Sequence, residues 1–93
     1  MADVKLGGWE LAEMQACGLP NPVATGFSEV IQHLKGADYT PVLYVGEQVV
    51  QGKNYAIICK QRIVVPNGPE HLVEFVINSF QDKWSVVSIT RIV

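Results

Sequence analysis

The residues of this chain that could do chemistry are two cysteines and two histidines. They are Cys17, Cys59, His33 and His71. A cysteine nucleophile needs a histidine nearby as its base, and the sequence does not show that either histidine lies close to a cysteine. The same four residues also lack the close spacing typical of a zinc site. Cys59 stands at an apolar position of an alternating segment, where a small buried thiol is the ordinary interpretation. We therefore expect no enzyme, no metal and no cofactor.

Two further patterns resemble known sites but fit them poorly. Gly46 to Asn54 has the glycines and the lysine of a phosphate-binding loop. It has one residue too many between its glycines, and Asn54 stands where that loop needs Ser or Thr to hold magnesium. Two glutamate pairs are better explained as surface charge than as catalytic carboxylates. These pairs are Glu10 with Glu13, and Glu70 with Glu74.

Composition narrows the classes of protein further. The chain has 93 residues, which suits a single domain over residues 1–93. Hydrophobic residues make up 48% and charged residues 17%, which excludes intrinsic disorder. The net charge is −2 and the basic residues are scattered, so we expect neither a nucleic-acid partner nor a membrane partner. Two cysteines are too few for a disulfide framework, and the start is no signal peptide, so free thiols and a cytoplasmic location are expected.

Hydrophobic spacing predicts one helix from Pro22 to Lys35. Asn21 is a good cap for its start, and Gly36 is a typical stop. One stripe of apolar residues repeats at helical spacing: Val23, Phe27, Val30, Ile31 and Leu34. Gly26 is expected where this helix crosses a strand closely. The lead-in from Trp9 to Ala16 is compatible with a second, short helix.

The rest of the chain predicts strands joined by short connections. The expected strands are Tyr39 to Val50, Tyr55 to Val65, Leu72 to Ile77 and Trp84 to Ile92, with a hairpin tip over Asn78 to Lys83. In the second strand one face is apolar, with Tyr55, Ile57, Cys59, Ile63 and Val65. Short connections imply an antiparallel meander. We therefore expect an α+β fold in which one helix packs across a four-stranded antiparallel sheet, and whether the N-terminal segment adds a fifth strand is left open.

The connection between the first two strands is unusual. Val49 and Val50 stand where a turn normally has Asn, Asp or Gly. One explanation is that the valines are exposed at a hairpin tip and await a partner that covers them. The other is that the strand runs on through Val50 and turns at Gln51 and Gly52. The residues alone do not decide between these explanations.

The same segment, Gln48 to Tyr55, resembles the QVVxG first hairpin of the cystatin superfamily, and in particular the QVVAGTNY of the stefins. Two weaker similarities fall in the right order. Gly7 and Gly8 precede the hairpin by about the distance found for the stefin N-terminal glycine, and His71-Leu72 with Phe75 is similar to the stefin strand pattern HLxxF. The chain departs from the pattern at Gln51, where stefins have Ala. Its second hairpin also has neither the LP pair of stefins nor the PW pair of other cystatins.

The resemblance implies an inhibitor of papain-like, cathepsin-type cysteine proteases, built on a cystatin-like fold. In that family a wedge of three strips fills the active-site cleft. Carried over by residue, the strips are Leu6, Gly7 and Gly8; then Gln48, Val49, Val50, Gln51 and Gly52; then Phe80 or Trp84. The resemblance also implies a monomer that can exchange strands into a domain-swapped dimer. Two alternatives stay open: a cystatin-like binding module that inhibits no protease, and an enzyme using Cys17 or Cys59.

Overall fold

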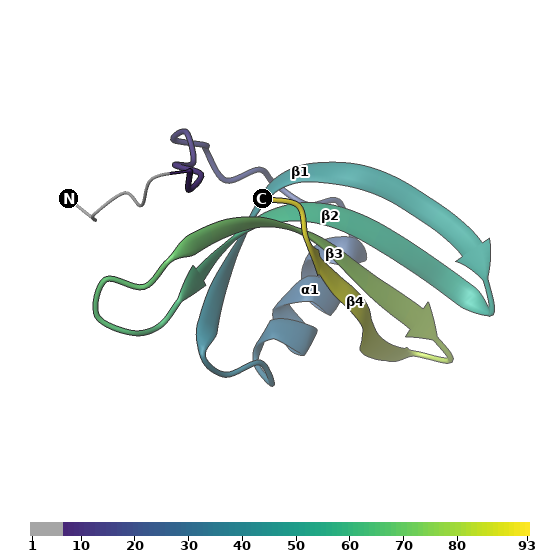
Figure 1. The fold of residues 1–93 in the computed structure, drawn as a ribbon. Coiled ribbons are helices and arrows are strands. Elements are labelled where there is room, and N and C mark those ends of the chain that lie inside the picture. Colours follow the sequence, from purple (N-terminus) through teal and green to yellow (C-terminus); the bar gives the residue numbers. More distant parts are fainter. Residues whose placement is uncertain (1–6) are drawn as a thin grey trace.

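A computed structural model describes residues 7–93 of the chain, and Figure 1 shows one helix lying across one face of a four-stranded sheet. The elements are α1 (Val23–Ile31), β1 (Ala37–Val50), β2 (Gly52–Ile63), β3 (Glu70–Phe80) and β4 (Lys83–Arg91). The strands lie in the sheet in chain order, and each pairs antiparallel with the next. The predicted α+β arrangement is confirmed.

The core lies between α1 and the middle of the sheet. Alternate residues of β2 and β3 point to the helix, which presents its apolar stripe in return. The buried side chains are Val23, Phe27, Val30, Tyr55, Ile57, Cys59, Val73, Phe75 and Ile77. The ring of Phe75 is central, because it meets Phe27 edge-on at 5.3 Å and Tyr39 at 5.1 Å between ring centroids. Ile63 and Val65 were expected on the buried face, but Ile63 is half-buried and Val65 is exposed beyond the end of β2.

The helix is shorter than its sequence predicts. Pro22 takes the cap position in place of Asn21, and no side chain caps the first turn. At the other end, His33 N–H donates to Val30 O and Leu34 N–H to Ile31 O, so the last turn tightens from i+4 to i+3 bonding. This tightening places Leu34 against the core and ends the helix before Gly36.

The described part of the lead-in, residues 7–20, forms neither the short helix expected over Trp9 to Ala16 nor a fifth strand. Residues 8–20 have no regular secondary structure. Trp9 is 74% exposed, and Leu19 is the lead-in residue that packs on the core, so little burial supports a helix here. The Cys17 N–H donates to the Pro41 carbonyl at 2.9 Å, which ties the lead-in to the free edge of β1.

Strand β1 lies at one edge of the sheet and is irregular. Its register against β2 shifts between Pro41 and Leu43 and again between Tyr44 and Gly46, so Val42 and Val45 are bulged residues. The chain from residue 7 to residue 93 contains no helix long and apolar enough to cross a membrane.

Candidate functional site

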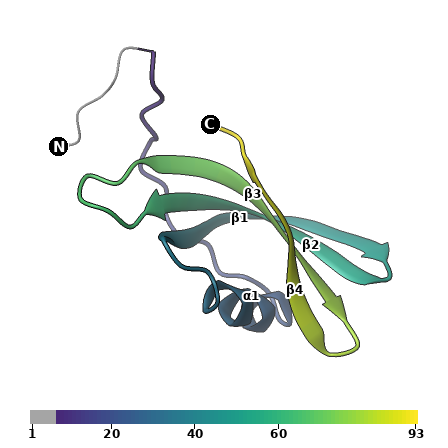
Figure 2. The ribbon, with the colours of Figure 1, turned by 60° about the horizontal axis from the view of Figure 1, so that its bottom comes forward.

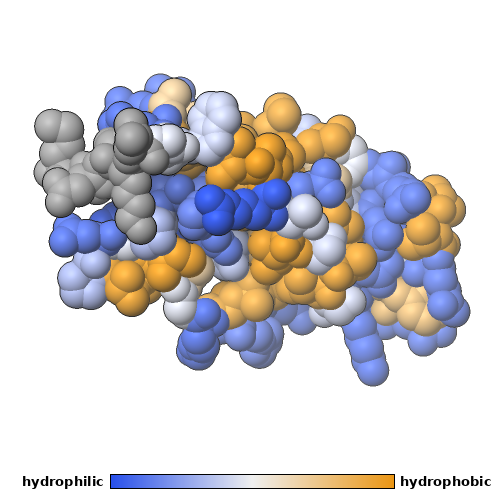
Figure 3. Space-filling model, in the orientation of Figure 1, coloured by the Kyte–Doolittle hydropathy of each residue, from blue (hydrophilic) through white to orange (hydrophobic). Residues whose placement is uncertain are grey.

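The turns of the two hairpins lie at the same end of the sheet. Figures 1 and 2 both show the β1–β2 turn beside the β3–β4 turn, with the β2–β3 connection at the opposite end. The register explains this, because Lys53 next to the first turn pairs with Ser79 next to the second. We call Val49 to Gly52 the first tip and Phe80 to Lys83 the second tip. Hydrophobic surface is visible at this end of the molecule in the space-filling view (Figure 3).

The first tip is a tight turn with uncovered valines. Strand β1 runs through Val50 and β2 begins at Gly52, so the turn falls at Gln51. Val49 is nevertheless 78% exposed and Val50 is 43% exposed. The strand therefore does run on through Val50, and the valines also leave apolar surface exposed.

Gly52 is required at this turn for two separate reasons. Its φ is +80°, a left-handed conformation that side chains disfavour. A Cβ at this position would also collide with the carbonyl oxygen of Ser79 on β3. The missing side chain therefore lets the first hairpin approach the strand that leads to the second tip.

Hydrogen bonds donated by side-chain amides link the first hairpin to β3. Asn54 Nδ2 donates to Gln48 Oε1 at 3.2 Å across the first hairpin. Asn78 Nδ2 on β3 donates to Asn54 Oδ1 at 3.0 Å and to the carbonyl oxygen of Gln51 at 3.2 Å. Asn78 was expected in the second turn but lies within β3, and no role was expected for it. The sequence did contain one signal for such a role: Asn is disfavoured in strands, so an Asn inside a strand suggests that its side chain makes a specific contact.

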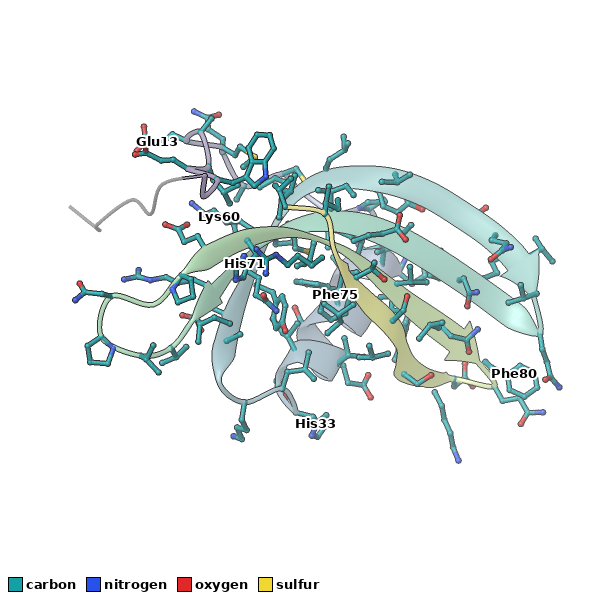
Figure 4. All side chains as sticks on the ribbon, viewed as in Figure 1. Glu13, His33, Lys60, His71, Phe75 and Phe80 are labelled. Atoms are coloured by element: carbon teal, nitrogen blue, oxygen red, sulfur yellow. The ribbon has the colours of Figure 1, made fainter. Side chains whose placement is uncertain are left out.

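The second tip presents Phe80, and Trp84 belongs to the packed interior. Phe80 ends β3 and is 37% exposed beside the turn (Figure 4). Gln81 and Asp82 both have positive φ, as a two-residue hairpin turn requires. Strands β3 and β4 therefore reach further into the expected tip than predicted.

Trp84 faces the helix. A Cβ at Gly26 would collide with the indole ring, which confirms the expected close crossing of helix and strand. The ring also lies 5.7 Å from that of Tyr55, between centroids. Of the two aromatic candidates, Phe80 is the one placed at a tip.

The described part of the lead-in lies away from both tips. Leu6 lies outside the described residues. Gly7 and Gly8 are exposed, and the φ of +80° at Gly7 gives the chain a bend that favours glycine. Figures 1 and 2 place this segment toward the end of the sheet that carries the β2–β3 connection. The structure thus brings the two hairpin strips together, and Gly7 and Gly8 lie apart from them.

The four residues considered for chemistry come from four different segments: the lead-in (Cys17), the turn after α1 (His33), β2 (Cys59) and β3 (His71). Cys59 is fully buried, and this burial, followed by the neighbouring Cys17, raises the pKa of its thiol to about 12. A thiol with that pKa is protonated near neutrality and is a poor nucleophile. His33 is exposed just after the helix, and His71 is half-buried on β3 (Figure 4). Within residues 7–93 no group of His, Cys, Asp and Glu is placed to hold a metal.

Two shallow hollows lie outside the tips. One is on the exposed side of α1, and the other lies between the start of β1 and the chain that follows β2. Neither contains a cysteine or a histidine, so neither adds a nucleophile or a catalytic base.

No protein-family model, curated protein or solved structure matches this chain. The geometry of the two tips and the resemblance of Gln48 to Tyr55 to the stefin hairpin are what bear on function.

Proposed function

We propose that this protein is a reversible, tight-binding inhibitor of papain-like cysteine proteases. The observation that carries the proposal is the exposed valine pair of the first tip, Val49 and Val50, at the same end of the sheet as the exposed Phe80 of the second tip. Two neighbouring apolar projections at one end of a narrow sheet suit insertion into a cleft. The protein would act by filling that cleft, with no covalent step and no cofactor.

The energetics of insertion favour the first tip. Fully burying a valine side chain contributes about 1.5–3 kcal/mol, and Val49 is 78% exposed before any partner binds. A turn already held by hydrogen bonds loses little conformational entropy on binding, so more of that contribution appears as affinity.

The turned backbone also supports resistance to cleavage. Proteases need an extended segment aligned with their catalytic group, whereas Gly52 is left-handed and the Gln51 carbonyl accepts a hydrogen bond from Asn78. A peptide bond in this turn is therefore out of register for attack while the turn stays closed.

The glycine strip is the part of the proposal that needs movement. Leu6, Gly7 and Gly8 would join the wedge if the lead-in swung toward the tips. Among the described residues, the backbone hydrogen bond nearest the start of the chain is that of Cys17, so the segment from Gly7 has no backbone tie to the sheet.

The free thiols of Cys17 and Cys59 suit a reducing compartment, and the cytoplasm is the proposed location.

A second candidate is a cystatin-like binding module that inhibits no protease. The observation that favours it is the separation of Gly7 and Gly8 from the two tips, because only two of the three expected strips adjoin. A wedge of two strips would bind a protease cleft more weakly, and the same exposed valines could serve another partner.

Titration of papain with the protein, followed with a fluorogenic peptide, tests the proposal. We expect stoichiometric, reversible inhibition and an intact inhibitor afterwards. Val49→Asp should weaken inhibition by at least about tenfold, because a carboxylate would have to be buried in place of the valine.

Val64→Asp is the matched control for this experiment. Val64 is 58% exposed and follows β2 at the end of the sheet opposite the tips, so its replacement should leave inhibition unchanged. Absence of inhibition by the parent chain would favour the binding module. Equal losses in both variants would show that Val49 makes no specific contact.

A further inference from the structure

Asn78 occupies a position in β3 from which it can reach the first hairpin. It lies opposite Asn54 on β2 and opposite Ser85 on β4, on the face of the sheet away from α1. Its side chain is half-buried, although the strand ends only two residues later. Its amide group therefore lies next to the turn of the first tip.

The Asn78 amide nitrogen donates to groups on both sides of that turn. Its two hydrogens are shared among three acceptors: the Gln51 carbonyl oxygen at 3.2 Å, the Lys53 carbonyl oxygen at 3.4 Å and Asn54 Oδ1 at 3.0 Å. Asn54 in turn donates to Gln48 at 3.2 Å, so the bonds continue into β1. One side chain of β3 thus contacts the residues before and after Gly52.

A second contact at the same place acts in the same direction. Gly52 lies so close to the Ser79 carbonyl that a Cβ would collide with it. Ser79 is the neighbour of Asn78 and of Phe80. The backbone that leads to the second tip therefore touches the turn of the first tip directly.

We propose that Asn78 is a positioning residue that holds the first tip closed and fixes its place relative to the second tip. This inference rests on the proposed function only for the identity of the partner, a papain-like protease. Asn78 acts through the turn: its bonds keep Val49 and Phe80 in one arrangement, so that both can enter a cleft together.

The consequence for binding follows from the populations of closed and open turns. Glycine is the most permissive residue of the backbone, so a turn containing Gly52 samples other conformations once its bonds are lost. When only a fraction of molecules has the competent turn, the apparent dissociation constant rises by the inverse of that fraction. Association also slows, because fewer encounters meet the competent form.

The test combines papain inhibition with backbone order parameters from NMR relaxation for residues 49–53. The variants are Asn78→Ala, which removes the donor, and Asn78→Asp, which keeps the shape but turns an oxygen toward three acceptor oxygens. We expect the order parameters to fall from about 0.85 toward 0.6. We expect inhibition to weaken about tenfold through slower association, with Asn78→Asp at least as affected as Asn78→Ala. Should Asn78→Ala fail to fold, Asn78→Ser gives the same comparison with a short hydroxyl in place of the amide.

Gln61→Ala is the matched control. Gln61 Nε2 donates to the Tyr39 hydroxyl at 3.0 Å at the other end of β2, so this variant also loses an amide hydrogen bond between strands. It should leave the order parameters of the first tip and the inhibition of papain unchanged.

Retention of both properties by Asn78→Asp would overturn the proposal, since a purely steric role survives an isosteric change. Equal loss in Gln61→Ala would overturn it as well, because the effect would then come from general loosening of the sheet. If the parent chain does not inhibit papain, the proposed function fails, and the order parameters still decide the role of Asn78.

Discussion

Replacing Gly52 by alanine should destabilise the protein through two effects, backbone strain and a steric collision. Substitutions at two other glycines allow each effect to be measured separately. The left-handed backbone, with φ of +80°, costs an alanine about 1–2 kcal/mol. The collision of the new Cβ with the Ser79 carbonyl forces a backbone shift, and overpacking of this kind costs about 1–3 kcal/mol. Together the effects reach about 2–5 kcal/mol, a large part of the roughly 5–15 kcal/mol that stabilises a native domain.

Two control variants isolate these effects. Gly36 also has a positive φ, +89°, but a Cβ there would meet nothing within 4 Å, so Gly36→Ala measures the backbone strain alone. Gly18 has open space and no positive φ, so Gly18→Ala should be neutral or slightly stabilising. The expected order of destabilisation is Gly52→Ala, then Gly36→Ala, then Gly18→Ala.

Urea unfolding at equilibrium measures the free energies of unfolding, and thermal unfolding gives an independent check. For a domain of this size about 1 kcal/mol lowers Tm by roughly 4–8 °C, so Gly52→Ala should lower it by about 8–40 °C. Gly52→Ala should also weaken papain inhibition, because the first tip moves. If Gly52→Ala costs no more than Gly36→Ala, the close approach of the first hairpin to β3 is wrong.

Three further outcomes are expected. Deleting residues 1–8 should leave melting nearly unchanged but speed dissociation from papain, and equal dissociation rates would show that the hairpins act alone. A dimer made by partial heating through exchange at Gln51 should not inhibit papain, because merging β1 with β2 removes the first tip; activity of separated size-exclusion fractions checks this. Native Cys59 should resist a thiol reagent at pH 8, because burial raises the pKa of its thiol from 9.0 to about 12. The free energy of unfolding should fall as pH rises above about 9, because the thiol ionises first in the unfolded chain. Reaction of Cys17 and Cys59 at equal rates in the folded protein would contradict this.

Local patterns predicted the core of the fold well. The stripe of Val23, Phe27 and Val30 identified the buried face of α1, and the alternation around Ile57 identified that of β2. Both follow from the period of the backbone itself, so no knowledge of other elements was needed. The helix end was not predictable in the same way, because its last turn tightens to bring Leu34 onto a core that the sheet completes.

The site was predictable only in part, for a related reason. Two valines, Val49 and Val50, stood out because valine is unusual in a turn. Gly52 stood out because glycine is typical of one. The role of Asn78 depends on the register of β3 against β2, which places its amide beside the first turn. The inward orientation of Trp84 depends on Gly26, a residue far away in the sequence. Contacts between segments far apart in the sequence decide the role of Asn78 and the orientation of Trp84. A local sequence pattern carries no information about such contacts.

The irregular edge of β1 bears on the tendency of the protein to aggregate at high concentration. An open strand edge is a template on which another chain can add, which is how fibrils grow. Strand β1 is long enough to act as such a template, but bulges at Val42 and Val45 break its repeat and Pro41 has no N–H to offer. The row of donors and acceptors is therefore interrupted between Pro41 and Gly46, beside the exposed Leu43 and Val45, which shortens the stretch of this edge on which another chain could add.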